Sequence, residues 1–247
     1  MRVSAPTLAF QSERKKMKEN LSDNLAMTVA ETGCMELPGE ILEFSIDQVL
    51  DEGILKDIPV VGWIAKGVSF KRSISDRMFY HKILRFLIAL EEIGEGDREL
   101  FRAKVRDDNK YRRKVGEHLL VLIDKIDAFE KAFLLARCFD HFLTGHIDHE
   151  YFIDLSHVVE RTPLSYLKAL SVPDNQRILF GSSGVAVACG LLEFGIAEPE
   201  PGEELPKLGT KISQYGRDLR DMFLGRFRER LANEKESRKQ FLNLFEK

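Results

Sequence analysis

Histidines and aspartates gather between residues 140 and 157, in a stretch whose side chains could ligate a transition metal. Four of the six histidines fall here together with three aspartates: Asp140, His141, His146, Asp148, His149, Asp154 and His157. Imidazole nitrogens and carboxylate oxygens are the usual ligands of zinc and related metals. One hypothesis is therefore a metal-dependent hydrolase that uses four ligands: His141, His146, Asp148 and His149.

The spacing within this stretch favours a structural role over a metal site. It matches no H-E-x-x-H or related signature, and His149, Asp154 and His157 do not share one clean helical face. Asp148 is well placed to cap a helix that begins after it, and Gly145 to end the helix before it. We therefore expect these residues to shape a turn between two helices.

A run of mainly apolar residues, 53–70, contains the only tryptophan of the chain, Trp63. An apolar segment with a tryptophan suits the interface of a membrane or the surface of a partner. Six of its residues are the candidates for such contact: Ile54, Leu55, Val60, Val61, Trp63 and Ile64. Burial between helices is the alternative, because Pro59 and two glycines weaken a continuous helix. No run of about 18 uncharged apolar residues occurs, so no membrane-spanning helix is expected.

Cations concentrate between residues 102 and 114, where they could contact phosphate groups. The candidates are Arg102, Lys104, Arg106, Arg112, Arg113 and Lys114. The formal net charge of the whole chain is −3, so no overall field attracts nucleic acid. A solvated charged surface is the alternative interpretation of such a run.

The pattern of apolar residues predicts a mainly α-helical chain, a helical bundle followed by a small winged-helix-like α+β module. Apolar residues recur at helical spacing in segments near 73–93, 97–105, 109–126 and 128–143. The predicted organisation is a polar, irregular N-terminal extension (1–37), a helical bundle (38–145), the winged-helix-like module (146–232) and a C-terminal tail helix (233–247).

The module after Gly145 is predicted from the order of its elements. Two helices separated by Thr162-Pro163 are followed by a short helix near 176–180, a glycine-rich segment typical of a strand or turn, an acidic loop, a second strand at 211–215 and a helix from Gly216. The predicted recognition helix, 163–170, supplies only Lys168 as a cation. The loop carries four acids: Glu198, Glu200, Glu203 and Glu204. Sequence-specific DNA binding is therefore not expected.

The cysteines and the missing motifs point away from a secreted protein and from known cofactor sites. Cys34, Cys138 and Cys189 are odd in number and include no C-x-x-C pair, which fits a reducing cytosol better than a disulfide framework. No P-loop, dinucleotide fingerprint or nucleophile elbow is present, so we expect no cofactor and no catalytic residues. The charged start of the chain leaves no room for a secretory signal.

Three segments, GILKDIPVVGWIAKG, ISDRMFYHKILRFL and KISQYGRDL, together with the glycine-rich part near Gly184, resemble an uncharacterised class of bacterial helical proteins. That class is similar to the Abi-alpha abortive-infection proteins, and the resemblance covers about residues 40–225. It implies a bacterial origin and a role against phage. It supplies no catalytic residues.

Three functions follow from the sequence as expectations. The first is a non-enzymatic cytoplasmic interaction or regulatory protein, in phage defence or a stress response, that binds a protein partner or itself. The second is a membrane-acting effector that uses segment 53–70 and is peripheral to the membrane. The third is the metal-dependent hydrolase. Nucleic acid could bind only without sequence specificity.

Overall fold

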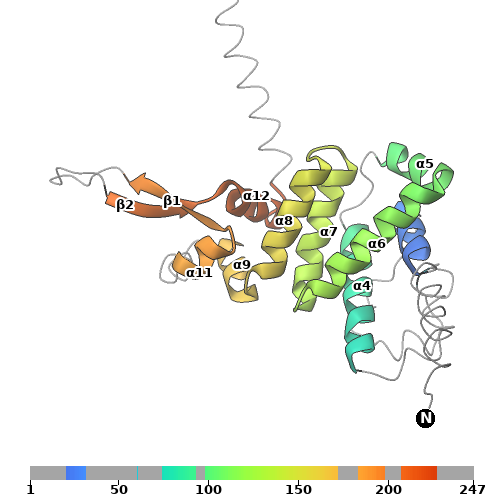
Figure 1. The fold of residues 1–247 in the computed structure, drawn as a ribbon, viewed down its shortest axis with the longest axis horizontal. Coiled ribbons are helices and arrows are strands. Elements are labelled where there is room, and N and C mark those ends of the chain that lie inside the picture. Colours follow the sequence, from blue (N-terminus) through green and yellow to red (C-terminus); the bar gives the residue numbers. More distant parts are fainter. Residues whose placement is uncertain are drawn as a thin grey trace, which may run out of the picture. The chain divides into compact units, whose positions relative to one another are not determined.

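The computed structural model describes residues 21–31, 60, 74–92, 98–171, 183–197 and 207–226. This part of the chain is mainly helical and contains one two-stranded antiparallel sheet (Figure 1). The chain divides into two compact units, Met1–Ala136 (unit 1) and Arg137–Lys247 (unit 2). The division lies inside α7 (Phe129–Leu143), whereas the sequence predicts a boundary after residue 145.

Unit 1 contains the predicted helices of the bundle. They are α4 (Ile74–Glu92), α5 (Glu99–Asp107), α6 (Asn109–Lys125) and the start of α7. Helix α6 packs against α4 and α5, and the buried side chains include Phe86, Leu90, Val105, Leu119 and Ile123. The apolar spacing in the sequence therefore predicts both the helices and their buried sides correctly.

A further helix of unit 1, residues 21–31, corrects the prediction of an irregular extension over 1–37. Its buried residues recur at helical spacing: Leu21, Leu25, Ala26, Val29 and Ala30. Two of the five are alanines, whose small side chains make the stripe hard to notice among polar neighbours. The predicted tail helix 233–247 lies outside the described residues.

This helix approaches α6 so closely that one position can only be glycine. A Cβ atom built on Gly116 would lie 1.9 Å from the carbonyl oxygen of Ser22, far inside van der Waals contact. The neighbouring atom belongs to the backbone and cannot move aside cheaply. Gly116 therefore sets the distance between α6 and the 21–31 helix.

The described residues of unit 2 contain the predicted pair of helices, two strands and a last helix, together with one helix that the sequence does not predict. Two helices, α8 (His149–Arg161) and α9 (Leu164–Ser171), are followed by α11 (Ser183–Ala188), β1 (Leu192–Ala197), β2 (Lys207–Ile212) and α12 (Gln214–Phe223). The glycine-rich segment thus forms a short helix as well as a strand, and β2 begins before the predicted residue 211. The predicted short helix near 176–180 lies outside the described residues.

Local capping explains where α7 and α8 meet. The backbone N–H of Tyr151 donates to Asp148 Oδ1 over 2.8 Å, so Asp148 caps α8 as predicted. Gly145 follows α7 with φ of 71°, a left-handed conformation that glycine adopts without strain. The sequence prediction of a turn at this position is confirmed.

The strands β1 and β2 form a hairpin that extends beyond helices α8, α9 and α12 of unit 2 (Figure 1). Its register pairs Leu192 with Ile212, Phe194 with Thr210 and Ala197 with Lys207. Because residues alternate between the two faces of a sheet, each face carries its own chemistry.

Helix α12 is joined to the base of the hairpin through backbone contacts. The N–H of Ser213 donates to the Leu191 carbonyl over 3.0 Å, and its hydroxyl donates to the Gly190 carbonyl over 2.5 Å. The same hydroxyl oxygen accepts from the N–H of Gly216 over 3.0 Å, which caps α12. A Cβ on Gly216 would lie 2.4 Å from the Leu191 carbonyl oxygen, so this position also requires glycine.

Replacing Gly116 by alanine is expected to destabilise unit 1 by about 1 to 3 kcal/mol, because two backbones would have to separate. Urea unfolding followed by circular dichroism measures this change. The matched control is Gly184→Ala in α11, where a Cβ would meet nothing within 4 Å. Alanine there should be neutral or stabilising by up to about 1 kcal/mol. Equal effects of the two substitutions would contradict the close packing at Gly116.

Candidate functional site

Two of the six predicted phosphate contacts, Arg102 and Arg112, are engaged inside unit 1. Arg102 Nε donates to the Ala30 carbonyl over 2.9 Å and is only 13% exposed. Arg112 donates to the Val105 carbonyl over 3.4 Å and to Asn109 Oδ1 over 2.7 Å. These guanidinium groups join α5 and α6 to the 21–31 helix, and their contact with phosphate stays a prediction.

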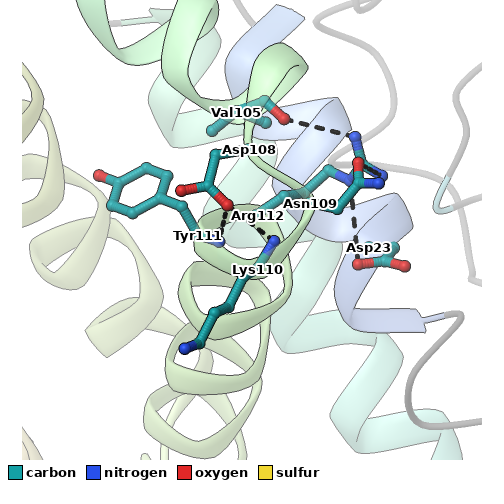
Figure 2. A network of polar contacts seen from close by, with 7 residues as sticks. All are labelled: Asp23, Val105, Asp108, Asn109, Lys110, Tyr111 and Arg112. Atoms are coloured by element: carbon teal, nitrogen blue, oxygen red, sulfur yellow. Dashed lines mark hydrogen bonds and ion pairs between the residues drawn. The ribbon is translucent and has the colours of Figure 1, made fainter.

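The corner between α5 and α6 is a polar network centred on Arg112 (Figure 2). Besides its two hydrogen bonds, Arg112 lies with Nε 3.9 Å from Asp23 Oδ1, on the neighbouring helix. Asp108 caps α6 by accepting from the N–H groups of Lys110 and Tyr111, each over 2.9 Å. The network uses the fork of donors that a guanidinium offers and lysine lacks.

The other four predicted cations remain exposed. Lys104, Arg106, Arg113 and Lys114 lie on α5 and on the first turns of α6, and Lys104 Nζ is 4.2 Å from the centre of the Tyr111 ring. Exposed cations on a solvated helix are common and point to no particular ligand. These four exposed cations are therefore weaker evidence for a phosphate-binding site than the sequence suggests.

The histidines and aspartates of residues 140–157 are not brought together as a metal site. No three His, Cys, Asp or Glu residues converge in the described parts of the chain, which include this entire stretch. His141 is buried and its ring meets that of His146 edge-on at 5.5 Å, while Asp148 is used as the α8 cap. His149 is exposed and contacts the Phe142 ring. The metal-ligand hypothesis is therefore not supported.

These residues instead form the turn after α7. The N–H groups of His146 and Ile147 both donate to the His141 carbonyl, and Thr144 Oγ1 lies 2.6 Å from His146 Nδ1. Such bonds satisfy the carbonyls that a helix leaves free at its C-terminus. The backbone groups of His141 and His146 thus take part in ending α7.

Most of segment 53–70 lies outside the described residues, including Ile54, Leu55, Val61, Trp63 and Ile64. Val60 is described and is fully buried, and its N–H donates to Thr28 Oγ1 over 3.2 Å. Contact of Val60 with a membrane or partner stays a prediction, which this burial does not favour. No helix in the described part of the chain has the length and hydropathy needed to cross a bilayer.

Cys138 is a buried part of the unit 2 core. Its Sγ lies 3.7 Å from Met222 Sδ of α12, and burial, with a smaller effect of the Asp218 charge, raises the pKa of Cys138 to about 12. A thiol with such a pKa is not a nucleophile at neutral pH. Cys138 is therefore a core side chain of unit 2.

Two tyrosines join α8 to α12 in a reciprocal arrangement that the sequence does not predict. Tyr151 of α8 donates to Asp218 Oδ2 of α12 over 2.5 Å, and Tyr215 of α12 donates to Asp154 Oδ2 of α8 over 2.9 Å. Their rings stack with centroids 5.3 Å apart. The hydrogen bond to Asp154 raises the pKa of Tyr215, so the hydroxyl stays a donor at neutral pH. We assign this cluster a structural role, because its polar groups satisfy one another.

One face of the hairpin, in the described part of unit 2, has no such structural role inside the unit. Leu192, Phe194, Thr210 and Ile212 lie on this face, named here the apolar hairpin face. Leu192 is buried at its base, but Phe194, two residues farther out, is 64% exposed. On the opposite face Lys211 Nζ pairs with Glu193 Oε1 over 3.2 Å. The hairpin therefore separates apolar from charged residues.

Helix α11 contacts β1 and is likewise uncharged. Its Val185 is 46% exposed. Apolar residues alternate with other residues in LEFGIA and KLGTKI, which predicts one apolar face of the hairpin. The sequence alone does not show that this face extends beyond the core. The candidate functional site is therefore the apolar hairpin face together with Val185.

Comparison of the chain with protein-family models, with curated proteins and with solved structures gives no match. The resemblance to the Abi-alpha proteins consequently stays a prediction. The site must be interpreted from its own chemistry.

Substitutions of two adjacent arginines test whether the polar network at the α5–α6 corner is structural. Arg112→Ala should destabilise unit 1 by about 1 to 3 kcal/mol, because several hydrogen bonds of a charged group are lost. Arg113→Ala removes an exposed cation and should change stability by no more than about 0.5 kcal/mol. Urea unfolding of both variants measures the difference. Equal losses would show that Arg112 is not a structural residue.

The burial of Cys138 predicts a slow thiol reaction. A variant with Cys34→Ser and Cys189→Ser keeps Cys138 alone, and one with Cys34→Ser and Cys138→Ser keeps the partly exposed Cys189. At pH 8, Ellman's reagent should modify Cys138 at least about a hundredfold more slowly than it modifies Cys189, because the Cys138 thiolate is scarce and the side chain is buried. Both thiols should react at once in denaturant. Fast modification of native Cys138 would contradict the packing of α7 against α12.

Proposed function

We propose that the chain is a non-enzymatic interaction protein that binds a protein partner through the apolar hairpin face and α11 of a winged-helix-like unit 2. The observation that carries the proposal is Phe194, a large aromatic side chain that is 64% exposed on an otherwise apolar face. Aromatic residues at the centre of an uncharged patch are typical of protein interfaces.

The order of elements in unit 2 supports the winged-helix-like description. Three helices, α8, α9 and α11, precede a β-hairpin whose loop takes the place of the wing. The helix directly before the hairpin is α11, whereas the sequence prediction places the recognition helix at 163–170. A recognition helix for DNA presents cations and hydrogen-bonding side chains, and α11 contains only serine, glycine, valine and alanine.

The charges of unit 2 favour protein over nucleic acid as the ligand. The loop of residues 198–206 contains four glutamates and no cation. Glutamates beside a phosphate backbone repel it, and the lost counterion release would leave little affinity. A winged-helix-like unit with an apolar helix and an acidic wing is therefore best suited to bind protein.

The biological setting is proposed from the resemblance to abortive-infection proteins. It suggests a bacterial cytoplasmic protein that acts in phage defence or a stress response. A regulatory protein of this kind needs a binding surface and no catalytic residues. In the described part of the chain, Asp148, Tyr151 and Tyr215 use their polar groups in capping and packing.

Site-specific photocrosslinking in bacterial cells tests the proposal. A benzoylphenylalanine at position 194 should give a covalent adduct with another protein, because the partner covers this face. The matched control is position 211, on the charged face of the same strands, whose side chain is also 64% exposed. An adduct that forms only after phage infection would support the defence role. Equal adducts at both positions, or none at 194, would contradict the proposal.

A further inference from the structure

We draw no further inference here: the strongest candidate, the apolar hairpin face with the exposed side chain of Phe194, already carries the proposed function, and nothing in the described part of the chain shows what covers it.

Discussion

The contact between the first turn of α12 and the backbone at residues 190 and 191 is the constraint on which the binding surface depends. Ser213 bonds both carbonyls, and Gly216 leaves no room for a side chain against Leu191. Tyr151 and Tyr215 then bind α12 to α8. The base of the hairpin is thereby fixed to the helices, which leaves the outer part of its apolar face without core to cover it.

In unit 2 the paired charged side chains and the exposed apolar side chains lie on separate surfaces, and the exposed apolar surface is the candidate binding site. Between α8 and α12, Tyr151 bonds Asp218 and Tyr215 bonds Asp154. On the charged face of the hairpin, Lys211 pairs with Glu193. The exposed apolar side chains Val185 and Phe194 lie on α11 and β1, and the sequence between the two strands contains four glutamates. Unit 1 differs, because its prominent arginines connect its own helices.

Hydrophobic spacing predicts α4 to α9, because the apolar side chains that recur along these helices are buried. It does not predict the 21–31 helix or α11. Capping at Asp148 and Gly145 is also predicted correctly, since it depends on neighbours in the sequence. The roles of Arg112 and Phe194 could not be predicted. Whether an arginine faces solvent or another helix depends on Asp23, far away in the chain, and the exposure of Phe194 depends on where the helices beneath the hairpin end. Sequence proximity of histidines likewise does not imply a common face.

The outer part of the apolar hairpin face, at Phe194, is open to solvent until a partner covers it. Acrylamide quenching of a tryptophan at position 194, in a variant with Phe194→Trp and Trp63→Phe, measures this directly. Acrylamide should quench this tryptophan nearly as strongly as it does in the unfolded chain, and a bound partner should protect the tryptophan from quenching. Strong protection of this tryptophan in the isolated protein would show that the face is already covered and would contradict the account.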